Sequence, residues 1–160
     1  SHICRKAKEA GFIHYEVSNW ARGTENIAIH NSAYWEGVPY LGLGPGAHGF
    51  KGVQRYANVS NNNKYIQSIA NGEIPEETET LTLLDRSNEV LMTGLRTAKG
   101  VDFDELKSKF QVDHLSENIE AWKRLVINGA VVQVGNRWRV SEKYWVVGDS
   151  IASDLISLQP

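Results

Sequence analysis

The hydrophobic period of this chain changes near residue 61, and this change limits the fold more than any other feature of the sequence. Before that point, segments such as "FIHYEV" at 12–17 are rich in β-branched and aromatic residues, which is typical of strands. After it, apolar residues recur three or four positions apart, which is typical of amphipathic helices. The 160 residues suffice for one ordinary domain or two small ones. We therefore expect an α+β protein whose second part is mostly helical.

The first part begins with a helical pattern that ends at Gly11 and leads directly into the strand "FIHYEV". A helix followed at once by a strand is half of a βαβ unit, so we expect a piece of a larger α/β protein. Residues 19–31 are predicted to be irregular, "SAYWEG" a short turn or helix, and "YLGLG" a strand. "HGFKGVQRYANV" predicts a hairpin that turns at Lys51-Gly52.

The second part predicts a series of helices with recognisable ends. A short helix is expected after a cap at Asn61 or Asn62 and before Gly72, followed by the acidic connector "EIPEETETLT". A longer helix should begin at Thr82, and the residues expected on its apolar face are Leu84, Val90, Leu91 and Leu95.

Two further helices and a hairpin complete the pattern. Asp102 is the expected cap of one helix, and Ser116 the expected cap of another that runs to Gly129 with Ile119, Trp122 and Val126 on one stripe. A hairpin is predicted about Gly135-Asn136, and a last helix carries Ile151, Leu155 and Leu158. Helices, hairpin and helix in this order are typical of a winged-helix-like domain.

Composition excludes several classes of protein. The formal charge is −2 with no basic block, so nothing in the electrostatics indicates nucleic acid. The helix "ENIEAWKRLVI", which would read DNA in a winged helix, balances Lys123 and Arg124 with two glutamates. No apolar run approaches the ~18 residues of a membrane span. The single cysteine, Cys4, allows no disulfide and no cluster of several thiolates, so we expect a reducing, cytoplasmic location.

The glycine run "GLGPGA" is similar to a dinucleotide-binding fingerprint, but that fingerprint must open a helix. Here Pro45 interrupts it and a strand pattern follows, so we reject this interpretation. Two interpretations remain open for the glycines: a tight structural turn, or a loop whose backbone approaches a flat ligand.

Four histidines lie away from this glycine run, and we expect different roles for them. His14 and Glu16 point to one face of a strand and could bind a metal, but a structural histidine is favoured because the sequence offers no third ligand nearby. His2 and His114 lie among polar residues and are expected to face solvent. His30 shares a helical face with Tyr34 and lies near Trp35, which suits either a capped turn in a core or a haem site.

The stretches "HYEVSNWA", "HNSAYW", "YLGLGPGAHGF" and "NEVLMTGLRTAKGVD", in this order, resemble HemW-type radical S-adenosylmethionine proteins. These are relatives of the oxygen-independent coproporphyrinogen III oxidases. The resemblance implies a remnant of a partial, TIM-like α/β barrel at 1–60, followed by a HemN C-terminal-like helical domain with a hairpin at 61–160. It also implies S-adenosylmethionine and a [4Fe–4S] cluster in the full-length protein. The cluster's three-cysteine motif is missing here, so we expect this chain alone to have no radical activity.

The resemblance also implies a site. The motif His-Asn-x-x-Tyr-Trp is associated with haem binding in this family, and it corresponds here to His30, Asn31, Tyr34 and Trp35. His30 becomes the expected ligand of the haem iron, with Tyr34 and Trp35 as walls. The positions expected to line the cofactor are Gly42, Gly44, Gly46 and Ala47.

The family divides into two functions. HemW-type members are haem chaperones that bind haem or porphyrin and deliver haem to recipient proteins, whereas the oxidases convert coproporphyrinogen III to protoporphyrinogen IX by oxidative decarboxylation. The complete His-Asn-x-x-Tyr-Trp motif favours the chaperone. The oxidase is the alternative, and a winged-helix DNA-binding module is a weaker one.

Overall fold

The computed structural model describes residues 2–158, which form two compact units. One unit combines the described residues up to 36 with those from 83 onward, and the other contains 37–82. Helices and strands both contribute to the fold, which confirms the α+β expectation. These two units are defined by how compactly their residues contact one another and not by similarity to other proteins. The division of the chain into domains at 1–60 and 61–160 therefore stays a prediction.

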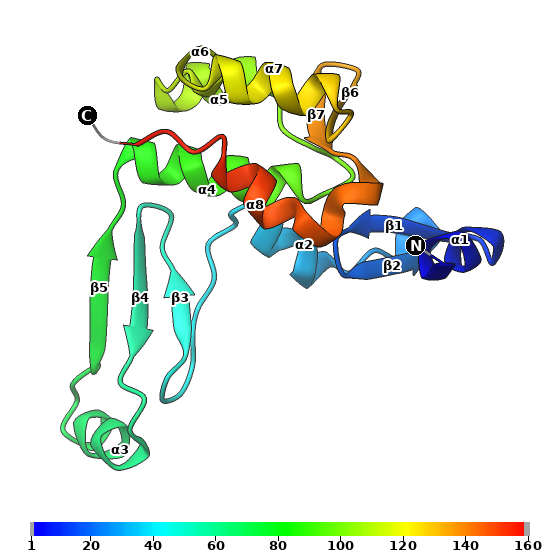
Figure 1. The fold of residues 1–160 in the computed structure, drawn as a ribbon. Coiled ribbons are helices and arrows are strands. Elements are labelled where there is room, and N and C mark those ends of the chain that lie inside the picture. The colour runs from blue at the N-terminus through cyan, green and yellow to red at the C-terminus, as the bar shows by residue number, and fades with distance from the viewer. Residues whose placement is uncertain (1, 159–160) are drawn as a thin grey trace. The chain divides into compact units, whose positions relative to one another are not determined.

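The first unit begins with a helix and a hairpin (Figure 1). Its elements are α1 (His2–Glu9), β1 (Phe12–Glu16), β2 (Asn19–Arg22), η1 (Thr24–Asn26) and α2 (Ile29–Trp35). The predicted strand is confirmed as β1, but it pairs antiparallel with β2, where an irregular segment was expected. The reason is a cross-strand pair: His14 lies opposite Trp20, and their rings stack with centroids 4.1 Å apart.

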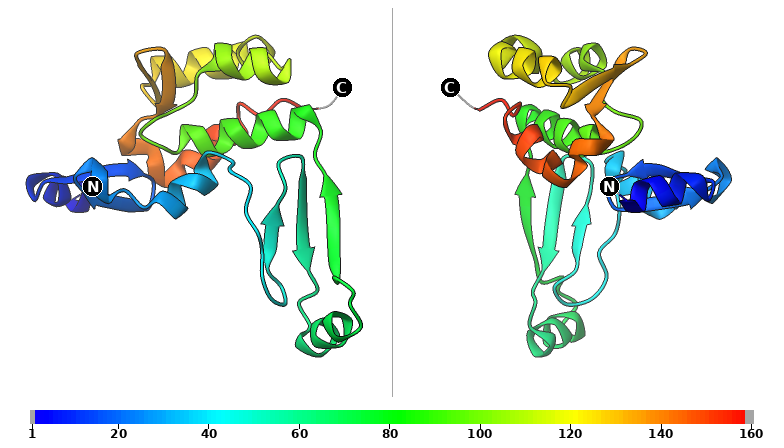
Figure 2. Two further views of the ribbon diagram at one scale, coloured as in Figure 1. Left: turned by 180° about the vertical axis from the view of Figure 1, so that it is seen from behind. Right: turned by 45° about the vertical axis from the view of Figure 1, so that its right-hand side comes forward.

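The remainder of the first unit is mostly helical and encloses the main hydrophobic core (Figure 2). Its elements are α4 (Leu83–Leu95), α5 (Phe103–Phe110), α6 (His114–Glu117), α7 (Ile119–Ile127), β6 (Val131–Val134), β7 (Arg137–Val140), η2 (Glu142–Val147) and α8 (Gly148–Ser153). The centre of the core includes Leu91, Leu95 and Val140, none of which is exposed. The predicted hairpin about Gly135 is confirmed as β6–β7.

The single helix expected from Ser116 to Gly129 is two helices. Asp113, not Ser116, is the cap, because its carboxylate accepts hydrogen bonds from the backbone N–H of Ser116 at 3.1 Å. The chain then leaves helical geometry at Asn118 before α7 begins. The expected stripe is also wrong in part, since Trp122 is buried whereas Ile119 and Val126 are exposed.

Two other expectations in this unit are wrong. His114 was expected in solvent but is 1% exposed, because hydroxyls of Ser87 and Ser157 lie 2.7 Å and 2.9 Å from its two ring nitrogens. Leu158 was expected on the apolar face of the last helix, but α8 ends earlier and Leu158 is exposed. Ile151 and Leu155 are buried as expected.

The second unit is a small antiparallel sheet with one helix. Its elements are β3 (His48–Phe50), β4 (Gln54–Asn58), α3 (Asn62–Ala70) and β5 (Glu76–Thr80), and the strand order is β3-β4-β5 (Figure 1). The predicted hairpin at Lys51-Gly52 is confirmed, and so is the cap at Asn61, which accepts a hydrogen bond from the Lys64 backbone N–H at 3.0 Å.

Two strand assignments in this unit were wrong. The acidic connector contains β5, which pairs with β4 along its whole length. Two ion pairs help to stabilise this acidic segment: Lys51, in the turn before β4, contacts Glu76 at 2.8 Å, and Arg55 of β4 contacts Glu79 at 3.0 Å. "YLGLG" forms no strand and contributes only an isolated bridge between Tyr40 and Phe50.

No helix within residues 2–158 has the length and apolar character needed to cross a bilayer.

Candidate functional site

The motif "HNSAYW" forms most of α2, a helix of 7 residues in the first unit. The helix begins after Ala28, whose extended backbone leaves its carbonyl free to accept the Ser32 N–H at 2.9 Å. It ends at Glu36, and Gly37 follows with a φ of +66°, a left-handed conformation that glycine tolerates. Local sequence therefore determines both ends of the helix.

His30 and Tyr34 occupy one exposed face of α2, as their spacing predicts. Their ring centroids are 4.8 Å apart and their planes meet at 80°, an edge-to-face contact. Tyr34 is 44% exposed, so the pair remains accessible despite its large aromatic area. A neutral imidazole in this position has the chemistry of an axial ligand for haem iron.

Trp35 and Asn31 are more buried than this pair. The Arg96 guanidinium lies over the Trp35 ring at 5.2 Å from its centroid. The indole Nε1 of Trp35 and the amide Nδ2 of Asn31 are buried donors with no hydrogen-bond partner within residues 2–158. The four motif residues therefore do not converge on one cavity: two are presented outward, and two lie in the interior side of the helix.

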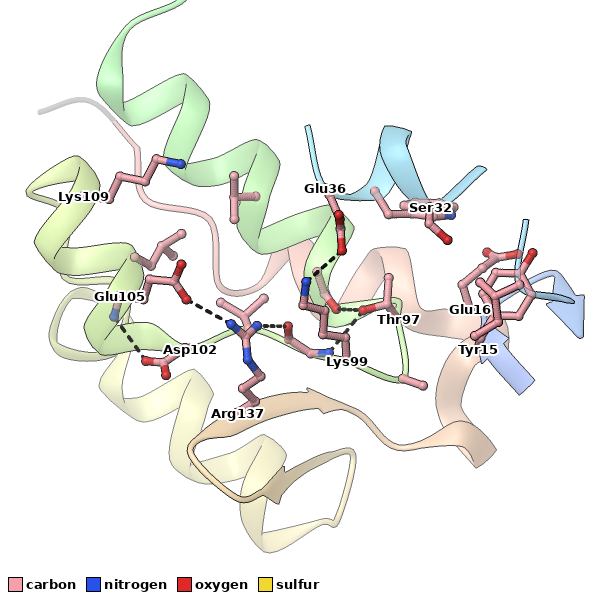
Figure 3. A pocket seen from close by; sticks show the side chains of 18 of the residues that line it. Tyr15, Glu16, Ser32, Glu36, Thr97, Lys99, Asp102, Glu105, Lys109 and Arg137 are labelled. Atoms are coloured by element: carbon pink, nitrogen blue, oxygen red, sulfur yellow. Dashed lines mark hydrogen bonds and ion pairs between the residues drawn. The ribbon is translucent and has the colours of Figure 1, made fainter. Parts of the chain in front are cut away.

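A cavity of about 600 Å³ lies in the first unit, and Trp35 lines it (Figure 3). Ser32 and Glu36 of α2 also line the cavity, and further lining residues come from the segment 94–110. Apolar side chains such as Val101 and Phe110 contribute much of the surface. A volume of this size is typical of sites for small organic ligands.

Four of the charged groups that line this cavity form two ion pairs (Figure 3). The Lys99 ammonium contacts the Glu36 carboxylate at 2.7 Å. The Arg137 guanidinium contacts Glu105 at 2.9 Å and donates to the Gly100 carbonyl at 3.0 Å. Sequence reasoning missed the cavity, because its walls come from segments far apart in the chain and no local pattern connects them.

Glu16 lies at the edge of the cavity and is completely buried. The Asn19 amide donates to one carboxylate oxygen, whereas Oε2 has no partner among the described residues. The indole Nε1 of Trp20 is also buried and has no hydrogen-bond partner among the described residues. Unpaired buried polar atoms are costly, and residues 16–35 contain four of them, in Glu16, Trp20, Asn31 and Trp35.

The glycine run belongs to the second unit, whereas α2 belongs to the first. Its loop is held by β4: the Gly42 N–H donates to the Tyr56 hydroxyl at 2.9 Å, and the Asn58 amide donates to the Gly44 carbonyl at 2.8 Å. A Cβ on Gly42 would lie 2.2 Å from the His48 carbonyl oxygen. Gly44 and Gly46 have φ values of +96° and +69°. These contacts explain the three glycines structurally, and their predicted role beside a cofactor, together with that of Ala47, stays a prediction.

Residues 81–147 match the model of the HemN C-terminal domain family. The chain is 49% identical over 67 residues to the heme chaperone HemW of Mycobacterium tuberculosis (strain CDC 1551 / Oshkosh), which covers 41% of this chain and 17% of that protein. It is 40% identical over 109 residues to the mitochondrial radical S-adenosyl methionine domain-containing protein 1 of Danio rerio, covering 61% and 24%. The chain is a relative of the HemW and HemN proteins.

The fold is also similar to that of a solved structure. The structure of the coproporphyrinogen III oxidase HemN from Escherichia coli matches 98% of this chain and 39% of that chain, with a TM-score of 0.70 and 16% sequence identity. At this identity the match concerns the fold alone. The chain thus spans well under half the length of the HemW and HemN proteins it matches.

Proposed function

We propose that this chain is part of a HemW-type haem chaperone and that it binds haem through His30. The observation that carries the proposal is the exposed edge-to-face pair of His30 and Tyr34 on α2. The pair presents an imidazole beside an aromatic ring on an accessible face, in a chain whose relatives include proteins named heme chaperones.

An exposed histidine ligand suits a protein that transfers haem better than one that retains it. Haem bound against one helix face buries less apolar area than haem in a closed cavity, so it is held less tightly and released faster. His30 would supply the iron ligand, and Tyr34 would pack against the macrocycle. Trp35 and Asn31 would support the helix from its buried side.

The residues present do not fit an iron–sulfur cluster. Such clusters are held by several cysteine thiolates, and this sequence contains one cysteine. The family relationship suggests a cluster and S-adenosylmethionine in the complete protein, but we assign no step of either to the residues of this chain. When bound, haem supplies the iron that His30 would ligate.

The finer fold is part of the proposal. We infer that α4, α5 and α7 with the β6–β7 hairpin form a winged-helix-like domain, and that α1 and β1 correspond to the end of a barrel.

We propose that the winged-helix-like domain is a packing and interaction module that does not bind nucleic acid. Two ion pairs support this: Lys123 with Glu120 at 3.0 Å and Arg124 with Asp154 at 2.8 Å. Neutralised cations gain little from a phosphate backbone. The proposed location is the cytoplasm.

Haem transfer tests the proposal against the oxidase alternative. The full-length protein is loaded with haem and mixed with apomyoglobin, and the Soret band is followed against a control of free haem. The proposal predicts transfer to apomyoglobin and no decarboxylation of coproporphyrinogen III under reducing, anaerobic conditions with S-adenosylmethionine. Decarboxylation without haem binding would establish the oxidase instead.

A further inference from the structure

A second group of chemically reactive side chains lies in the first unit, formed by Cys4 of α1, His14 of β1 and Glu142 of η2. One donor atom from each lies within 4.8 Å of the other two. The three residues come from segments far apart in the chain, so the sequence alone gave His14 no third ligand. None of them belongs to α2 or to the cavity beside it.

We propose that Cys4, His14 and Glu142 bind one Zn²⁺ ion. Thiolate, imidazole and carboxylate are the three donors that zinc uses most, and three protein ligands leave a fourth position for water. Zinc–ligand bonds place the donor atoms roughly 3.3–3.8 Å apart in a tetrahedral site. The donor atoms of the three side chains lie within 4.8 Å of one another, which is near this spacing.

Both ring nitrogens of His14 face oxygen atoms of the protein. Its Nε2 lies 3.4 Å from the Val17 carbonyl oxygen, which can only accept a hydrogen bond. Its Nδ1 lies 2.8 Å from the Glu142 carboxylate, so two of the three proposed ligands already point at each other. A ligating histidine that donates its second nitrogen to a backbone carbonyl is the usual arrangement at metal sites.

Aromatic rings fix the orientation of His14. Trp20 stacks on the imidazole at 4.1 Å, Trp145 contacts it edge-on at 4.3 Å, and the side chain is 5% exposed. A ligand that is already rigid loses little conformational freedom when metal binds. Access comes from the other side, where a second cavity of about 400 Å³ is lined by Cys4 and Glu142.

The Lys8 ammonium competes with a metal ion for the Glu142 carboxylate. It contacts the second carboxylate oxygen of Glu142. Zinc would replace the ammonium at this oxygen and release the proton of the Cys4 thiol.

The test uses the full chain, reduced and free of oxygen, with Zn²⁺ titrated by calorimetry and Co²⁺ as the optical probe. We expect Co²⁺ to produce a thiolate charge-transfer band in the near ultraviolet. Cys4→Ser should remove the band and weaken Zn²⁺ binding by at least about tenfold. His48→Gln, at an exposed histidine of the other unit, should change neither. Mg²⁺, which prefers oxygen ligands, should not compete.

Substitution of Lys8 tests whether its ammonium and Zn²⁺ compete for Glu142, because a purely structural ion pair would not affect Zn²⁺ affinity. Lys8→Met should strengthen Zn²⁺ binding by about fivefold, whereas Lys6→Met on the same helix should leave it unchanged. α1 has no buried residue, so these variants and Cys4→Ser should keep the fold. Equal Zn²⁺ affinity in the wild type and Cys4→Ser, or no charge-transfer band in the wild type, would overturn the proposal. The haem residues are untouched, so this outcome leaves the proposed function intact.

Discussion

At the scale of single residues, His114 shows how a polar side chain becomes part of the core. Both ring nitrogens are satisfied by serine hydroxyls, one from α4 and one from the segment after α8. Burial lowers the pKa of His114 and outweighs the opposite effect of Glu117, so the neutral form is favoured. A polar neighbourhood in sequence predicted exposure, because the two serines are distant in the chain.

This residue gives a pH dependence. Because its pKa in the folded state lies below the ordinary value of 6.5, the unfolded state binds a proton first as the pH falls. The stability from His114 is therefore complete above pH ~6.5 and is lost as the pH falls toward the folded pKa. We expect the difference in unfolding free energy between wild type and His114→Gln to shrink over this window. A difference independent of pH in urea titrations would show that the ring is not buried in its neutral form.

Trp122 provides the corresponding test for the core. Its ring contacts Phe103 and Trp138 edge-on, each with centroids 4.9 Å apart. Trp122→Ala should lower the free energy of unfolding by roughly 3–5 kcal/mol, since it removes a large buried side chain. Ile119→Ala on the same helix, at a position 43% exposed, should change it by less than about 1 kcal/mol. Equal losses in chemical denaturation would contradict the observed face of α7.

At the scale of elements, features set by neighbouring residues, such as helix caps, were predicted correctly, whereas strands that depend on pairing with a distant segment were not. The cap of α5 was predicted because Asp102 accepts N–H groups only two and three residues away. The strands β2 and β5 were missed because each is stabilised by a partner strand rather than by its own composition. In the candidate site, the shared face of His30 and Tyr34 was predictable from helix spacing. The cavity beside Trp35 was not, since it requires tertiary contacts.

The glycine run gives a prediction at this scale. Gly42→Ala places a methyl group against the His48 backbone, which has no flexible end to move, so it should destabilise the second unit by about 1–3 kcal/mol or more. Gly46→Ala meets only atoms of Ser60 at 3.6 Å and should cost about 1–2 kcal/mol for its left-handed backbone alone. Amide hydrogen exchange in β3 and β4 measures both. A larger loss of protection in Gly46→Ala would refute the close approach at Gly42.

At the scale of the whole molecule, the chain matches 39% of the HemN structure in fold and contains a single cysteine, whereas a cluster needs several. Reduction and cleavage of S-adenosylmethionine require that cluster. We therefore expect the purified chain to form no 5′-deoxyadenosine under reducing, anaerobic conditions. Duplex DNA should likewise fail to bind at micromolar concentration, because the cations of α7 are already paired. Production of 5′-deoxyadenosine, or salt-sensitive binding of DNA, would contradict this account.

The central claim is that His30 ligates haem iron, and haem titration of the full-length protein followed at the Soret band tests it most directly. His30→Ala removes an exposed side chain and leaves the buried contacts of Trp35 in place, so the helix should persist. His48→Ala, at an exposed histidine in β3, is the matched control. We predict that His30→Ala shifts the Soret band and weakens haem binding, while His48→Ala changes neither. An unchanged spectrum and affinity in His30→Ala would contradict the claim.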